Sequence, residues 1–88
     1  MIRIGYLPEF VRQYEKLPEA LKEEAKEKIA LLKDRANHKQ LRVHKLHGSQ
    51  KEYWSFSVNY CFRIMFTYVG KSKNNAVLMT IGDHSIYD

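Results

Sequence analysis

Residues 53–69 read YWSFSVNYCFRIMFTYV, two runs of alternating side chains on either side of a single asparagine, Asn59. Large apolar side chains occupy every second position of residues 53–58, and residues 60–69 continue the alternation. A period of two is typical of strands that bury one face, and asparagine suits a tight turn because it tolerates positive φ. The pattern therefore predicts a hairpin of two antiparallel strands.

Three other segments have the patterns of strands. Residues 2–6 alternate in the same way, residues 41–46 form a candidate second strand, and residues 76–81 are continuously apolar or small. An unbroken apolar run is expected of a strand that is covered on both faces. We therefore expect residues 76–81 at the centre of the sheet.

Two helices are predicted between the first and second strands. Pro8 and Pro18 are each followed by a glutamate, an arrangement that suits the first turn of a helix. The second helix is predicted to run to about Arg35, with an apolar stripe at helical spacing and a charged outer face. Residues 1–88 are thus predicted to form one α+β domain of order β-α-α-β-β-β-β. Its short N-terminal strand and helical hairpin pack on one face of a four- to five-stranded, mainly antiparallel sheet.

Positive charge is concentrated in the second half of the chain. The formal charge is +5, and residues 37–73 carry seven Lys or Arg against one acid, Glu52, together with three of the four histidines. Such a field attracts polyanions, most often nucleic acid, and also acidic proteins. The single cysteine, Cys61, excludes a disulfide scaffold, and no apolar run is long enough for a signal peptide or a membrane span. We expect a soluble cytoplasmic domain with no membrane contact.

The residues available for chemistry are cations and imidazoles rather than paired carboxylates. The sequence has no Gly-rich phosphate loop, no serine nucleophile motif and no closed set of metal ligands, so we expect neither metal nor cofactor. RNA can be cleaved without either, because its own 2′-OH attacks the adjacent phosphate when a base, a cation and an acid are supplied. Histidine suits both proton transfers, and arginine binds two phosphate oxygens at once.

Each candidate residue also has a structural interpretation. Arg63 is unusual because a charge in the middle of a long strand implies an open sheet face, but a surface arginine could instead pair with Glu52 across the hairpin. Trp54 lies on an alternating apolar face and so suits the core. His84 suits a capping or surface position after the last strand, and Tyr87 could cover the sheet edge.

Four segments carry a family resemblance through their order and spacing. They are LRVHKLHG (41–48), YWSFSVNY (53–60), FRIMF (62–66) and IGDHSIY (81–87). They resemble the RelE/ParE superfamily of type II toxins, and the resemblance spans the chain. It implies a small basic toxin, either monomeric or in a hetero-oligomer with a cognate antitoxin that wraps it. RelE-like members cut mRNA in the A site of the 70S ribosome without metal, whereas ParE-like members inhibit DNA gyrase.

The resemblance implies roles for individual residues. Arg63 matches the strand arginine that contacts the scissile phosphate, His84 matches a C-terminal histidine used as general acid or base, and Tyr87 resembles a late aromatic that stacks on or orients the base. Lys45 and His47 lie where some branches place a histidine or lysine in the site. The predicted catalytic set is His84, Arg63, Tyr87 and His47; the predicted RNA- or phosphate-binding set is Lys45, His44, Arg42, Lys51 and Tyr53.

Two departures from the family pattern narrow the mechanism. The RelE prototype has two lysines at strand positions that are aromatic here, and the acidic base of the YoeB-like branch falls near Gln40, which cannot take a proton. We therefore expect a histidine to transfer protons, His84 first and His47 or His44 second. The leading hypothesis is a ribosome-dependent mRNA endonuclease. The alternatives are a gyrase inhibitor without nuclease activity and a degenerate toxin kept as a binding module.

Overall fold

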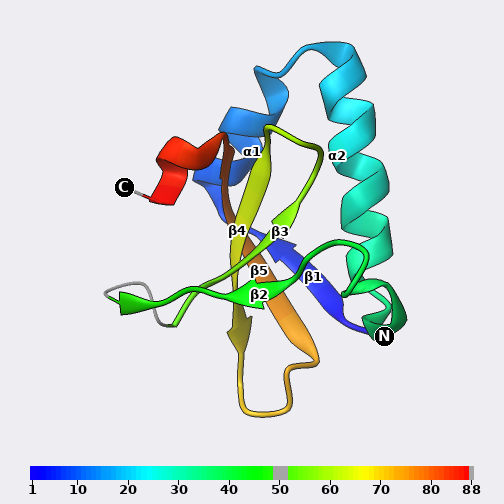
Figure 1. Cartoon of the computed structure of the whole chain (residues 1–88), viewed down its shortest axis with the longest axis vertical. Helices are drawn as coiled ribbons and strands as arrows, with labels where there is room; N and C mark the ends of the chain where they lie inside the picture. The colour runs from blue at the N-terminus through cyan, green and yellow to red at the C-terminus, as the bar shows by residue number, and fades with distance from the viewer. Residues whose placement is uncertain (49–51, 88) are drawn as a thin grey trace.

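The computed structural model describes residues 1–48 and 52–87, and within them five strands form one sheet (Figure 1). The strands are β1 (Arg3–Tyr6), β2 (His44–Lys45), β3 (Trp54–Ser57), β4 (Arg63–Val69) and β5 (Asn75–Gly82). Their order across the sheet is β1-β5-β4-β3-β2. β1 runs parallel to β5, and the other three neighbouring pairs are antiparallel. The predicted α+β class and mainly antiparallel sheet are confirmed.

Two helices follow β1, as the prolines predicted. α1 (Pro8–Glu15) has its proline in the first turn, and α2 (Glu19–Leu32) begins directly after Pro18. The predicted extension of α2 to Arg35 is wrong. The side chain of Asp34 accepts a hydrogen bond from the Ala36 N–H at 2.9 Å, and this cap begins a separate 3₁₀ turn, η1 (Arg35–Asn37).

The core lies between the helices and one face of the sheet. Phe56 and Phe66 are fully buried on neighbouring strands, with ring centroids 5.7 Å apart in an edge-to-face arrangement. Trp54 packs against this core and meets Tyr68 edge-on at 5.2 Å, while the Lys73 ammonium lies 4.8 Å from the centroid of the indole ring. The structural interpretation of Trp54 is therefore correct. The other core residues are Ile2, Phe10, Ala25, Ile29, Leu32, Leu41, Val58, Ile64, Ala76, Leu78 and Ile81.

β5 is an interior strand between β1 and β4, but the predicted position at the centre of the sheet is wrong by one strand, because β4 is the middle strand of the five. Only one face of β5 is fully covered. Its ladder with β4 is shifted by one residue, so that Met65 lies opposite Thr80 while Phe66 lies opposite Leu78. The extra residue is Met79, and it allows Leu78 and Ile81, three positions apart, to be buried together. The unbroken apolar run of residues 76–81 therefore reflects a bulge in β5. The residues of β5 that do not face the core are at most half-buried.

Two strands are shorter than the alternation predicted. The segment 41–46 keeps only two strand residues, because Arg42 adopts a left-handed backbone with φ of 59°. The segment 60–69 becomes a strand only at Arg63, since the preceding residues form the turn after β3. The expected positive φ at Asn59 is wrong: this residue shapes the turn through its side chain instead. Within the described ranges, no helix is both long and apolar enough to cross a membrane.

Candidate active site

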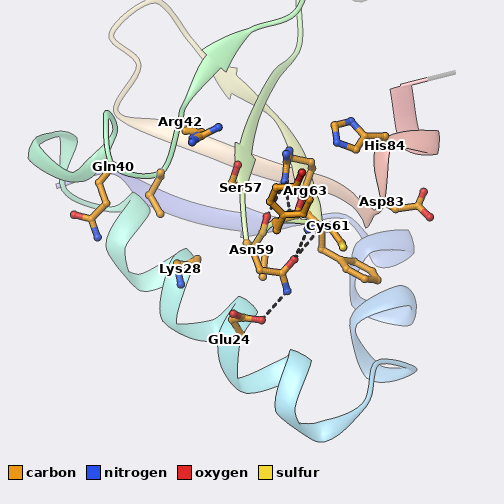
Figure 2. Close-up of a pocket in the computed structure, with 14 residues that line it drawn as sticks. Glu24, Lys28, Gln40, Arg42, Ser57, Asn59, Cys61, Arg63, Asp83 and His84 are labelled. Atoms are coloured by element: carbon orange, nitrogen blue, oxygen red, sulfur yellow. Dashed lines mark hydrogen bonds between the residues drawn. The ribbon is translucent and has the colours of Figure 1, made fainter.

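An open groove of about 1050 Å³ brings together residues that are far apart in the sequence (Figure 2). One wall is the turn between β3 and β4, and another is the chain from the end of β5 into a short 3₁₀ helix, η3 (His84–Tyr87). The floor and far rim come from α2 and from residues 40–42. The charged and imidazole side chains that line it are Glu24, Lys28, Arg42, Arg63, Asp83 and His84.

Arg63 is held at the start of β4 by its own hairpin turn. Its Nη1 donates to the carbonyl oxygens of Asn59 at 2.7 Å, Phe62 at 3.2 Å and Tyr60 at 3.3 Å. The alternative in which Arg63 pairs with Glu52 does not occur, because the guanidinium folds back onto the turn. Three carbonyl acceptors satisfy part of the guanidinium without neutralising it, so a positive charge remains in the groove.

His84 reaches the groove because the chain reverses closely after β5. Gly82 lies directly across the ladder from Arg63, and a Cβ built on Gly82 would collide with Cγ2 of Ile86. The absence of a side chain at Gly82 therefore lets Ile86 of η3 pack closely against the strand. Figure 2 shows the His84 ring on the same side of the groove as Arg63.

Asp83 anchors the start of this turn. Its carboxylate accepts the Ser85 N–H at 2.9 Å, and Figure 2 shows it directed away from Arg63. The Ser85 hydroxyl, and next the Ser85 N–H, hold the pKa of Asp83 below its ordinary value of 3.8. Asp83 is thus an ionised cap that fixes the direction of η3, and with it His84.

The predicted site residues in and after β2 occupy different places relative to Arg63. His44 pairs with Ser55 across the β2–β3 ladder, and Ser57, two positions on, pairs with Arg63. Side chains of directly opposed residues share a face and the pleat repeats every two residues, so His44 lies on the same sheet face as Arg63. Lys45 pairs with Trp54 and lies on the helix-covered face. His47 is exposed in the following loop, and neither His44 nor His47 is among the residues that line the groove.

The tautomer of His44 follows from its hydrogen bond. Nδ1 lies 2.9 Å from the backbone carbonyl of Arg42, and a carbonyl can only accept. In the neutral ring Nδ1 therefore carries the proton and Nε2 has the free lone pair. This is the state in which an imidazole can act as a base.

The remaining predicted site residues are placed as follows. Arg42 lines the groove, and its left-handed backbone sets where its exposed side chain leaves the chain. Tyr53 is half-buried just before β3 and is not part of the groove lining. Tyr87 ends η3, and its side chain, like the whole of Lys51, lies outside the described residues.

Sequence reasoning missed the acidic and basic residues that α2 adds to the groove. Glu24 and Lys28, one helical turn apart, were covered only by the general prediction of a charged outer face. No sequence signal distinguishes them from the other charges of the helix, because only the packing of α2 beside the β3–β4 turn brings them to the site. Within residues 1–48 and 52–87, no group of three His, Cys, Asp or Glu side chains is arranged to hold a metal ion.

Several solved structures have the same architecture as this chain. The structure of YafQ from E. coli strain BL21(DE3) superposes with a TM-score of 0.76 over 99% of this chain and 98% of its own, at 16% identity. The chain therefore has the same fold as YafQ. A scan of protein-family models and a search of curated proteins found no match to the sequence.

Two complexes of two proteins each contain a chain with the same fold. The YoeB–YefM complex from Staphylococcus aureus matches 96% of this chain and 98% of the solved chain, with 15% identity and a TM-score of 0.72. The archaeal RelE–RelB complex from Pyrococcus horikoshii OT3 matches 93% of each chain, with 14% identity and a TM-score of 0.71.

Proposed function

We propose that this protein is the toxin of a toxin–antitoxin pair and that it cleaves RNA without a metal ion, acting on mRNA in the ribosome. The observation that supports this proposal best is the groove that Arg63 and His84 line together. A fixed cation and an imidazole beside it are the groups that phosphodiester cleavage by the 2′-OH requires.

In the proposed reaction, the ribose 2′-oxygen forms a bond to phosphorus while the bond from phosphorus to the 5′-oxygen breaks. The 2′-OH proton passes to a base, the leaving 5′-oxygen takes a proton from an acid, and the products are a 2′,3′-cyclic phosphate and a 5′-OH. Arg63 stabilises the extra negative charge of the pentacoordinate phosphorus, because its guanidinium can bind two oxygens. His84 is the general acid.

The second proton-transfer group in this proposal is His44. It lies on the sheet face of Arg63, and its Nδ1–H bond to the Arg42 carbonyl leaves Nε2 available to accept the 2′-OH proton. Both His44 and His47 are exposed and outside the groove lining, so His44 is favoured over His47 by its place on the sheet face of Arg63 and by its bond to Arg42. Arg42 and Lys28, on the opposite rim, can contact the phosphates on either side of the scissile one.

The proposed partners are a cognate antitoxin, mRNA and the 70S ribosome. Two of the similar structures are complexes of a toxin with a second protein, which supports an antitoxin partner for this chain. The net charge of +5 suits both an acidic antitoxin and ribosomal RNA.

The test is induction of the chain in cells, with the 5′ ends of transcripts mapped during growth arrest. Codon-phased cuts that depend on translation are expected, and Arg63→Ala or His84→Ala should lower the cutting rate by about 10²–10³-fold without unfolding the protein. Arg12→Ala, which removes an exposed arginine of α1 outside the groove, is the matched control. Intact mRNA with stalled gyrase would instead identify a gyrase inhibitor, and intact mRNA without toxicity a binding module.

A further inference from the structure

The turn between β3 and β4 is built around the side chain of Asn59. Its Oδ1 accepts the backbone N–H groups of Cys61 and Phe62, each at 2.8 Å, and its own N–H reaches the Phe62 carbonyl at 3.4 Å. An Asx turn of this kind replaces the ladder hydrogen bonds that residues 60–62 would otherwise make as part of β4. The side chain of Asn59 therefore fixes the path of the backbone just before Arg63.

The other end of the same amide ties the turn to a helix. Nδ2 of Asn59 donates to Oε1 of Glu24 in α2 at 2.7 Å, across 35 positions of sequence (Figure 2). A hydrogen bond to a carboxylate is shorter and stronger than one between neutral groups. The turn is thus attached to α2, so its position relative to the rest of the groove is fixed as well as its shape.

The main chain of Asn59 then holds the arginine. The carbonyl of Asn59 accepts from Nη1 of Arg63 at 2.7 Å, the shortest of the three contacts of that nitrogen. Among the described residues, no hydrogen bond from Nε or Nη2 of Arg63 is present. One corner of the guanidinium is therefore fixed by the turn, and the Nε–Nη2 edge is left to form two parallel bonds to a phosphate.

We propose that Asn59 is a positioning residue, which together with Glu24 orients the Arg63 guanidinium toward the scissile phosphate. This inference rests on the proposed RNA cleavage for the identity of the ligand, but not for the contacts. A free arginine side chain has many rotamers, and a guanidinium that is already oriented loses less freedom when it binds the transition state. Misplacing such a group by about 1 Å costs on the order of 10²-fold in rate.

The decisive variants exchange the amide and the carboxylate. Asn59→Asp keeps the oxygen that accepts the two N–H groups of the turn, but it places a carboxylate against Glu24 and so breaks the attachment to α2. The double variant Asn59→Asp with Glu24→Gln restores it, because the glutamine amide donates to the new aspartate. Glu27→Gln, an exposed change on the same helix, is the matched control for loss of one negative charge.

Two measurements are made on each variant. The first is cleavage of ribosome-bound mRNA, for which we expect Asn59→Asp to lower kcat by about 10–100-fold, the double variant to recover it, and Glu27→Gln to match the wild type. The second follows Arg63 by NMR: hydrogen exchange of the Nη1 N–H groups, which the carbonyls of the turn hold, and the shift of the Nε–H signal on titration of an RNA oligonucleotide that carries a 2′-deoxy group at the cut site. We expect faster exchange and a weaker shift in Asn59→Asp, both reversed in the double variant.

The two measurements separate failure of the positioning role from failure of the proposed function. Wild-type kcat and wild-type Arg63 exchange in Asn59→Asp would overturn the positioning role, as would a defect that the double variant leaves unchanged. If the wild-type chain cleaves no RNA, the proposed function fails. The exchange and titration of Arg63 then decide the positioning role, because they require no catalysis.

Discussion

Replacement of Gly82 by alanine tests whether close packing between β5 and η3 places His84. The added Cβ would collide with Cγ2 of Ile86, and carbon atoms pack at about 3.5–4.0 Å, so the Ile86 side chain, or η3 with it, must move by about 1 Å or more. Overpacking of this kind costs about 1–3 kcal/mol of unfolding free energy. Because Gly82 does not have a positive φ, alanine is otherwise compatible with the backbone and would by itself be neutral or stabilising by about 0.4–1 kcal/mol.

The collision involves one methyl group, so a second substitution removes it. In an Ile86→Ala background Cγ2 is absent, and the remaining Cβ lies 3.9 Å from the new side chain, an ordinary contact. Gly82→Ala should therefore destabilise the wild-type chain by about 1–3 kcal/mol and leave the Ile86→Ala chain unchanged or slightly more stable. The sign of the Gly82→Ala effect is expected to depend on residue 86.

Urea unfolding followed by circular dichroism measures the four free energies of this cycle. The same proteins are assayed for RNA cleavage, where Gly82→Ala should lower the rate by about 10–100-fold because His84 moves with η3. A coupling energy below about 0.5 kcal/mol would refute the packing argument. A full loss of stability with unchanged cleavage would refute the claim that η3 places His84.

Two further predictions concern titration. Burial raises the pKa of Tyr68 above its ordinary value of 10.0, although the positive charge of Arg35 opposes this. The neutral form of Tyr68 therefore contributes stability below pH 10, and this stability is lost as the pH rises through the folded-state pKa. Arg35→Gln should raise the pKa of Tyr68 further, as measured by ultraviolet titration with Tyr68→Phe as the reference. The pKa of Asp83 is lowered by the Ser85 hydroxyl and N–H, so its carboxylate contributes stability above pH 3.8 that is lost as the pH falls through the lower folded-state pKa. Ser85→Ala should move the pKa of Asp83 back toward 3.8 in a carboxyl NMR titration, and an unchanged value would show that the hydroxyl does not contribute.

The turn after β3 was predicted correctly, but the physical reason given for it was wrong. Asn59 was expected to form the turn by adopting positive φ, but it does so by accepting two N–H groups through its side chain. The side-chain bond extends the turn to Phe62, so the strand starts at Arg63 rather than at Tyr60. Alternation alone cannot reveal this, because Tyr60 fits the strand period while lying 93% exposed in the turn.

The amino-acid sequence by itself determined the order of the elements, the apolar faces of the strands and the candidate residues Arg63 and His84. These features follow from local physics: side-chain periodicity, proline at helix starts and the chemistry of individual side chains. The placement of Glu24 at the groove, the position of His44 on the sheet face of Arg63 and the close approach of Ile86 to Gly82 were decided only by the tertiary structure. Each depends on strand register or on contacts between distant segments, which local sequence patterns do not contain.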